Sequence, residues 1–138
     1  MRINNRKQPT KTYKIEGAGR YALSDFCYIT EGKVFDALCS KRQGVLTIKN
    51  DGFQKKAIVI STGGDGGFND LLSGHQFSVD AGNLSFIPVE FLASQKNKEY
   101  PEPIIFSVEH ELRVSRGEGF FNVIIDNVPR AKIVGLWS

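Results

Sequence analysis

Long hydrophobic runs are missing from this sequence of 138 residues. A membrane-spanning helix needs about 18 or more consecutive apolar residues, so we expect no membrane insertion. The first residues carry charge but no apolar segment typical of a secretory signal, and we therefore expect a cytoplasmic protein. Cysteine is also scarce, because Cys27 and Cys39 are the only two. In a reducing compartment we expect both to be buried free thiols rather than a disulfide.

Several motifs of catalysis and ligand binding are absent as well. The sequence has two histidines and no His-Glu-x-x-His pair, which excludes a zinc-protease helix. Its glycine-rich stretch STGGDGGFND has neither the Gly-Lys-Ser/Thr of a phosphate-binding loop nor the spacing of a dinucleotide site. Asp65, Asn69 and Asp70 offer oxygen ligands for calcium, but the pattern is not that of an EF-hand. We therefore expect neither a metal ion nor a cofactor.

Glycine, by contrast, is abundant, with 14 residues in the chain. In a short chain this indicates many turns, and many turns favour many short strands over a few long helices. Hydrophobic residues make up 41% and charged residues 24% of the sequence, close to the averages of globular proteins. A chain of this length can bury one hydrophobic core without disulfides or metals, so we expect one folded domain.

Alternating apolar and polar residues predict short strands along most of the chain. The expected strand regions are 12–24 (two short strands or one bulged strand), 45–49, 56–62, 76–79, 83–88 and a three-stranded meander after residue 103. Asp51 and Gly52 suit the turn of a hairpin, and His110 falls inside a strand pattern. Helical spacing of apolar residues predicts one short helix over 33–41, and residues 89–93 suit a single helical turn.

These elements predict a mainly β fold, namely a single-domain antiparallel sandwich or open barrel with one short helix. We expect the domain to span residues 12–138 and to follow a flexible basic arm at 1–11. Residues 94–103 combine charge, amide and proline, and are expected to form a surface loop.

The net charge of +3 is concentrated at the N-terminus. The basic residues that precede the first acidic residue, Glu16, are Arg2, Arg6, Lys7, Lys11 and Lys14. Of the 18 basic residues, 13 remain in the rest of the chain beside 15 acidic ones, which leaves it nearly neutral. One hypothesis is nucleic-acid binding through Arg2, Arg6, Lys7 and Lys11, because a basic arm can gather phosphates. A solvated, frayed terminus explains the same charges.

Three aspartates, Asp25, Asp65 and Asp80, each stand beside the end of an expected strand. If a cleft brought them together with His75, they would form a candidate acid/base site of a small hydrolase or ligand-binding protein. Aspartate also occurs at turns for local reasons, because its carboxylate accepts hydrogen bonds from nearby backbone amides. Both interpretations remain open from the residues alone.

Three segments resemble the signatures of a family of small bacterial and phage proteins, a domain of unknown function. GRYALSDFCYI at 19–29 is similar to its DPCY signature, STGGDGGF at 61–68 to its GDG signature, and FSVDAGNLSFIPVEF at 77–91 to its VDAG signature. The resemblance covers about residues 12–92. Phe26 stands where the family usually has proline, and Gly67 separates the second signature from its aromatic residue, Phe68.

The resemblance implies that the three signature turns meet at one end of a sandwich or open barrel. There Asp65 and Asp80 are expected to support loops by accepting backbone hydrogen bonds. The candidate binding residues are Tyr28, Gly64, Asp65, Gly66, Phe68 and Asp80.

The leading functional hypothesis is a non-enzymatic protein-binding module in the cytoplasm of a bacterium or of a phage-infected host. Immunity, antitoxin and host-takeover proteins are the types of partner-binding protein it suggests. The alternatives are the hydrolase or ligand site at Asp25, Asp65, Asp80 and His75, and nucleic-acid binding through the basic arm. The sequence leaves the oligomeric state open.

Overall fold

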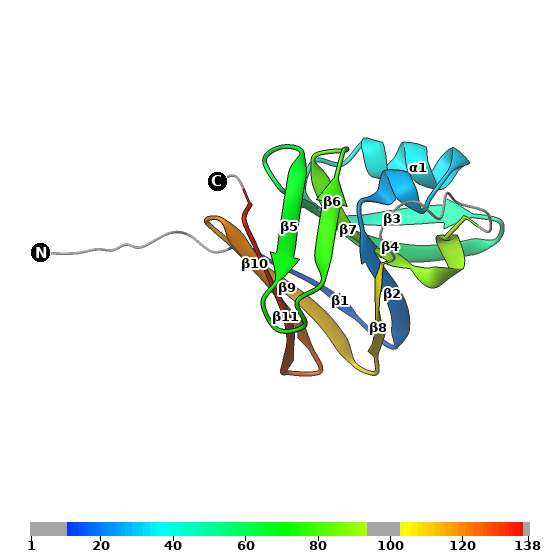
Figure 1. The fold of residues 1–138 in the computed structure, drawn as a ribbon. Helices are drawn as coiled ribbons and strands as arrows, with labels where there is room; N and C mark the ends of the chain where they lie inside the picture. Colours follow the sequence, from blue (N-terminus) through cyan, green and yellow to red (C-terminus); the bar gives the residue numbers. More distant parts are fainter. Residues whose placement is uncertain (1–10, 94–102, 137–138) are drawn as a thin grey trace, which may run out of the picture.

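The computed structural model describes residues 11–93 and 103–136, which form a two-layered antiparallel β sandwich (Figure 1). The strands of the six-stranded sheet, in spatial order, are β1 (Lys11–Glu16), β9 (Glu111–Gly117), β10 (Phe120–Ile125), β11 (Val128–Val134), β5 (Gly66–Asp70) and β6 (Gln76–Val79). Those of the five-stranded sheet are β3 (Gly44–Asn50), β4 (Phe53–Ser61), β7 (Asn83–Pro88), β2 (Gly19–Ser24) and β8 (Ile104–Val108). The predicted mainly β fold is confirmed as a sandwich rather than a barrel.

Within residues 11–93 and 103–136, three short helical segments accompany the sheets. They are the 3-10 turn η2 (Phe26–Tyr28), the helix α1 (Gly32–Cys39) and the 3-10 turn η3 (Val89–Phe91). The predicted helix and the predicted single helical turn are thus both confirmed. No helix in the described part of the chain is long and apolar enough to cross a membrane.

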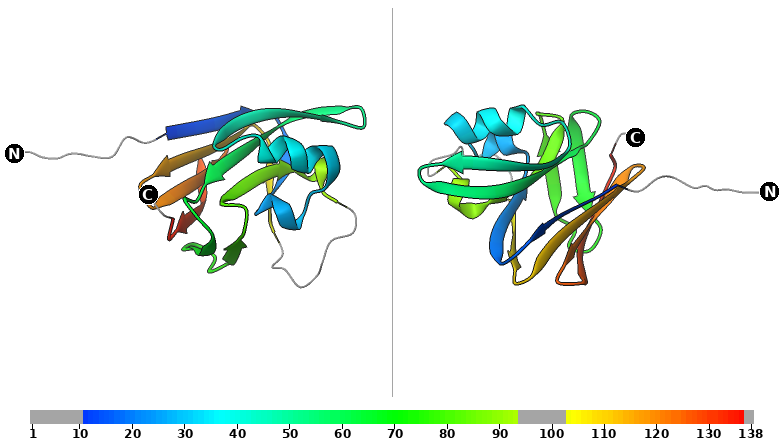
Figure 2. Two further views of the ribbon diagram at one scale, coloured as in Figure 1. Left: turned by 90° about the horizontal axis from the view of Figure 1, so that it is seen from above. Right: turned by 180° about the vertical axis from the view of Figure 1, so that it is seen from behind.

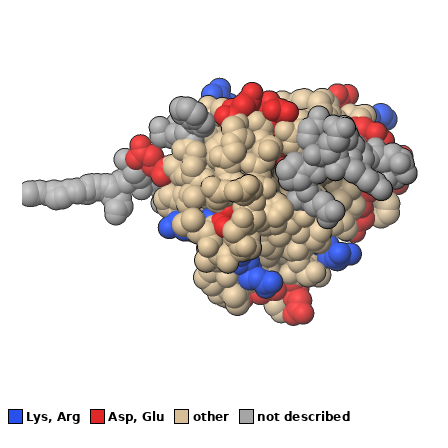
Figure 3. Space-filling model, in the orientation of Figure 1, with Lys and Arg blue, Asp and Glu red and all other residues tan. Residues whose placement is uncertain are grey.

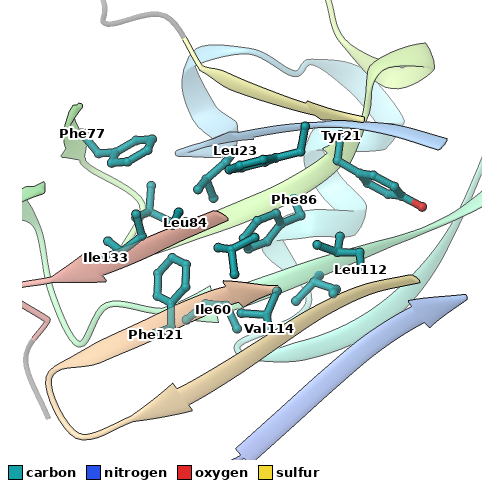
Figure 4. Packing of buried hydrophobic residues seen from close by; sticks show 14 of the residues in the cluster. Tyr21, Leu23, Ile60, Phe77, Leu84, Phe86, Leu112, Val114, Phe121 and Ile133 are labelled. Atoms are coloured by element: carbon teal, nitrogen blue, oxygen red, sulfur yellow. The ribbon is translucent and has the colours of Figure 1, made fainter. Parts of the chain in front are cut away.

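The main core lies between the two sheets, where alternate side chains of each strand point inward (Figure 4). Leu23 and Phe86 of the five-stranded sheet face Val114 and Phe121 of the six-stranded sheet in this core. The ring centroids of Phe86 and Phe121 are 6.0 Å apart in an edge-to-face arrangement, which is favourable for aromatic pairs.

The five-stranded sheet is buried on its second face as well. The helical segments α1, η2 and η3 pack on that face (Figure 2). They form a smaller apolar cluster there, and Phe26, Leu38 and Phe91 are among its members. As a result, every residue of β7 is buried, so its sequence NLSFIP shows no clean alternation. The α1 helix buries Val34 and Leu38 on the side that faces this sheet.

The hairpin formed by β3 and β4 was predicted correctly. Asp51 and Gly52 connect the strands with positive φ angles of 51° and 83°, respectively. Both values are in the left-handed region that a tight reversal of this type requires.

The predicted three-stranded meander is present as β9, β10 and β11, but its first strand is shorter than expected. The region expected to form its first strand contains two strands that lie in different sheets, β8 and β9, with a turn at Glu109 and His110 between them. His110 therefore lies in a turn and not in a strand. The turn is held by the distant carboxylate of Asp126, which accepts hydrogen bonds from both backbone amides at 3.0 and 2.7 Å, respectively. No glycine or proline marks this turn, so the alternation of apolar residues predicted a single strand across it.

The segments 76–79 and 83–88 form strands as predicted, and they lie in different sheets. They belong to one long hairpin that passes from one sheet into the other (Figure 1). One arm of this hairpin consists of β4 and β5, and the other consists of β6 and β7. β4 pairs with β7 in the five-stranded sheet, and β5 pairs with β6 in the six-stranded sheet. We call the place where both arms cross, residues 62–65 and 80–82, the corner. Thr62 donates its backbone N–H to the carbonyl of Gly82 there, at 3.0 Å.

Candidate functional site

The three signature segments meet at the corner, and the carboxylate of Asp25 joins two of them. Asp25 follows β2 and caps η2, where its Oδ1 accepts the backbone N–H of Cys27 at 2.9 Å. Its Oδ2 accepts the backbone N–H groups of Asp80 and Ala81 at 2.5 and 2.8 Å. Asp25 is 0% exposed. A buried carboxylate that accepts three amides holds the first and third signatures together.

A second hydrogen bond ties the same two segments. The hydroxyl of Tyr28 donates to Oδ2 of Asp80 at 2.8 Å. Burial of the phenol, this hydrogen bond and the negative charges of Asp80 and Asp25 all raise the pKa of Tyr28. The hydroxyl therefore keeps its proton and acts as a donor at physiological pH.

The glycine-rich segment forms the other arm of the corner. Thr62 is buried and donates its hydroxyl to the carbonyl of Gly64 at 2.6 Å, which closes the loop on itself. Gly63 and Gly82 have φ angles of 82° and 77°, a region that residues with a side chain rarely adopt. Glycines are therefore required here by the path of the backbone between the sheets.

Two side chains outside the signatures support the corner at Ser61. The guanidinium of Arg116 donates to the carbonyl of Ser61 at 2.9 Å through Nη2 and at 3.2 Å through Nε. Burial lowers the pKa of Arg116 from its ordinary value. Oε1 of Gln43 accepts the backbone N–H of Ser61 at 3.1 Å, while its Nε2 donates to the hydroxyl of Tyr13 at 2.9 Å. Sequence reasoning missed both residues, because no local signal links them to the glycine-rich loop.

A surface depression of about 410 Å³ lies beside the corner. It is lined by Cys39, Ser40, Lys41, Arg42, Ser61, Gly63, Gly64, Ala81, Gly82 and Asn83. The C-terminal end of α1 and both arms of the corner thus surround one hollow. Arg42 is exposed on its rim, and Asn83 is buried at its base with Oδ1 accepting the hydroxyl of Ser85 at 2.9 Å.

The structure corrects the predicted roles of the aspartates. Asp25, and not Asp65 or Asp80, accepts the backbone hydrogen bonds that hold the loops. Asp80 instead accepts the hydroxyl of Tyr28, and Asp65 is exposed at the tip of the glycine-rich loop. The sequence placed all three beside strand ends but did not distinguish which of them becomes buried.

The acid/base group of the hydrolase hypothesis is not assembled. The oxygens of Asp25 are bonded to amides, and His75 lies in the turn before β6, whereas Asp80 follows the end of that strand. Four strand residues span about 13 Å, so His75 is at the opposite end of β6. Its ring packs against Phe77 with centroids 4.5 Å apart, and its Nε2 is buried without a hydrogen-bond partner among the described residues.

The predicted binding residues divide into two groups. Gly64, Asp65, Gly66 and Asp80 lie at or near the surface of the corner. Tyr28 and Phe68 are only 5% and 1% exposed, so they support the loops from beneath and offer no contact surface to a partner.

The prediction that both cysteines are buried is wrong. Cys39 is exposed at the end of α1, and Cys27 is half-buried. Partial desolvation and the nearby carboxylates of Asp36 and Asp25 raise the pKa of the Cys39 thiol, which disfavours the nucleophilic thiolate. Within the described residues, no group of three or more His, Cys, Asp or Glu side chains could hold a metal ion.

Of the basic residues in the nucleic-acid hypothesis, Arg2, Arg6 and Lys7 lie outside the described residues. Lys11 is exposed at the start of β1. On the face shown in Figure 3, basic and acidic side chains are interspersed around a largely uncharged middle, so no broad field of one sign covers that face.

Comparisons with protein-family models, curated proteins and solved structures find no match to this chain. The likeness to the family with DPCY, GDG and VDAG signatures therefore stays an expectation from the sequence.

Proposed function

We propose that the protein is a non-enzymatic binding module that recognises a partner protein through the corner. The observation that carries this proposal is the clamp formed by Asp25, whose carboxylate accepts three backbone amides from two signature segments. A carboxylate engaged in this way is suited to hold loops in one conformation. Rigid loops lose little conformational entropy on binding, and loops at the end of a stable sandwich commonly carry recognition.

Exposed residues at and beside the corner offer a contact surface. Gly63, Asp65 and Gly66 are exposed on one arm, and Asp80 and Ala81 on the other. The depression beside them is large enough to receive a side chain of the partner, and a filled pocket at the centre of an interface is a common source of binding energy.

The end of α1 adds charge to this surface. Ser40 and Arg42 are exposed and line the depression together with Lys41. Arginine is enriched among the residues that dominate protein interfaces, because its guanidinium combines several donors with a flat apolar surface. Arg42 is therefore the proposed anchor on the protein's own side.

The proposed setting is the cytoplasm of a bacterium or of a phage-infected host, and the proposed class is that of immunity, antitoxin or host-takeover proteins. The sequence resemblance to bacterial and phage proteins supports this setting. The clamped corner supports a recognition role, and the two lines of support are independent.

Capture from a native lysate of the cells that carry the protein tests the proposal. A corner variant combines Asp65→Arg with Arg42→Glu; both positions are exposed, so we expect the replacements to leave the fold intact. The matched control is Thr47→Arg, at an exposed position of β3. We expect the wild type and the control to retain one stoichiometric partner that the corner variant loses. The absence of a stoichiometric partner, or equal retention by the corner variant, would contradict the proposal.

A further inference from the structure

The two sheets have four edge strands, and three of them are protected against pairing with another chain. An edge strand exposes unpaired N–H and C=O groups, and proteins usually block such edges with charge, proline or short length. β1 carries Lys11, Lys14 and Glu16, and β3 carries Lys49. β6 is only four residues long.

β8 lacks these protections. Its five residues read Ile-Ile-Phe-Ser-Val, without charge or proline. In the described part of the chain, β8 ends its sheet and pairs on one side only, with β2. An unprotected edge of this composition is a template for a further strand.

Ile105 is a second and independent sign of an interaction at this edge. It is 41% exposed in the interior of β8. The other exposed large hydrophobic residues of the described chain lie at the first residue of a strand or in a turn, and they are Phe53, Leu71, Leu72 and Val128. Position 105 thus combines an apolar side chain with a regular strand backbone that is open on one side.

We propose that β8 pairs in antiparallel orientation with β8 of a second copy of this chain, about a two-fold axis at Phe106. The pattern of the strand is self-complementary in this register. Ile104 of one copy faces Val108 of the other, and Phe106 faces Phe106, all on the side of the strand that packs into the main core. On the opposite side, Ile105 faces Ser107. The two five-stranded sheets then join into one continuous sheet.

The pattern favours this occupant over an unrelated strand. Since β2 fixes which side chains of β8 face the core, a shift of one residue would set core-side residues of one copy opposite outward-facing residues of the other. The proposed register instead keeps the core-side residues of both copies on one face of the joined sheet. A two-fold interface uses the same patch on both copies, as this symmetric pattern requires. With no charge on β8, no repulsion opposes self-pairing.

Sedimentation equilibrium over a range of protein concentrations tests the proposal. We expect the mass of the wild type to approach twice the monomer mass as the concentration rises. Ile105→Lys and, separately, Ser107→Lys are expected to abolish this increase, because a lysine at either position places charge in the pairing edge. The Ser107 change replaces an exposed polar residue, so it leaves the packed core intact. Circular dichroism verifies the fold of each variant.

The double variant Ile105→Lys with Ser107→Asp tests the register. In the proposed pairing each introduced lysine faces an introduced aspartate of the other copy, so dimer formation should return. Leu71→Lys is the matched control, since it changes a 61% exposed leucine in the β5–β6 turn and should leave the dimer unchanged. A monomer at every concentration, a dimer that survives Ile105→Lys, or no recovery in the double variant would overturn the proposal.

Discussion

Asp25 and Asp126 both clamp backbone turns, the first in the interior and the second near the surface. Asp25 accepts the amides of Cys27, Asp80 and Ala81 and joins segments that are 55 residues apart. Asp126 likewise accepts three amides, at 2.7 to 3.0 Å, and fixes the turn between β8 and β9 across 15 to 17 residues. The two sites use the same chemistry, yet Asp25 is fully buried and Asp126 is partly exposed.

The difference shows that the importance of such a clamp depends on its surroundings. When a buried carboxylate is removed, its amide donors lose their partner and have no water to replace it. Near the surface, water can take the place of the carboxylate. Removal of the Asp25 carboxylate is therefore expected to cost more stability than removal of the Asp126 carboxylate.

The largest effect is expected for Asp25→Ala. The change leaves three amides without their acceptor, and we expect a loss of about 4 kcal/mol in the free energy of unfolding. Urea denaturation measures this loss. Asp65→Ala is the control, because it removes an exposed carboxylate from the same corner. Equal stability of the two variants would show that the buried clamp is not needed.

A smaller loss is expected for Asp70→Asn. Asp70 is buried and accepts hydrogen bonds from the amides of Leu72, Ser73 and Lys132 and from the hydroxyl of Ser73. The amide group of asparagine can accept at only one of its two ends. We expect the free energy of unfolding, measured by urea denaturation, to fall by about 2 kcal/mol. A decrease as large as that of Asp25→Ala would contradict the expected order of the two variants.

The same residue predicts a pH dependence. Burial opposes the charge of Asp70, but the hydrogen bonds from Ser73, Lys132 and Leu72 outweigh it, and the pKa of Asp70 falls below its ordinary value of 3.8. The ionised Asp70 carboxylate therefore contributes fully to the free energy of unfolding above pH 3.8. This contribution is lost as the pH falls through the lower pKa that Asp70 has in the folded state. The stability difference between wild type and Asp70→Asn should therefore shrink on acidification from pH 6 to pH 2. A difference that stays constant over this range would contradict the assignment.

Tyr28→Phe tests the second connection of the corner. The change removes the hydrogen bond from the hydroxyl to Asp80 but keeps the buried ring, so we expect a loss of about 1 kcal/mol. If the bond contributes through Asp80, the double variant with Asp80→Ala should be no less stable than Asp80→Ala alone. Additive losses in this double-mutant cycle would show that the two residues act separately.

The smallest effect is expected for Asp126→Asn. Asp126 has a φ angle of 53°, a conformation that asparagine tolerates, so the change removes charge without adding backbone strain. Hydrogen bonds from the amides of Glu111 and Glu109 hold the pKa of Asp126 below its ordinary value. Its contribution should likewise disappear in acid, and thermal denaturation at pH 7 should show a smaller shift than for Asp70→Asn. A larger shift would reverse the comparison between buried and exposed clamps.

The sequence pattern predicted most strands, the one helix and the hairpin at Asp51 and Gly52. It failed at the turn of Glu109 and His110, where the residues that form the turn carry no turn signal. The signal lies in Asp126, at a distance along the chain that no local pattern covers.

The candidate site was predicted only in part. The expectation that the signature turns meet was made from the resemblance, and the structure brings Asp25, Tyr28 and Asp80 into contact. Which aspartate becomes the buried acceptor could not be predicted, because all three suit a turn equally well in sequence. Gln43 and Arg116 gave no signal, since their partner Ser61 is remote from both in the chain.

Local features of the chain were sufficient for the class of fold, because alternation of side chains and the φ angles of a turn depend on a few adjacent residues. The exchange of the long hairpin between two sheets, and the burial of Asp25 beneath it, arose only when distant segments packed together. A carboxylate becomes a buried clamp through the amides that surround it in space, and those amides come from parts of the chain that no local pattern connects.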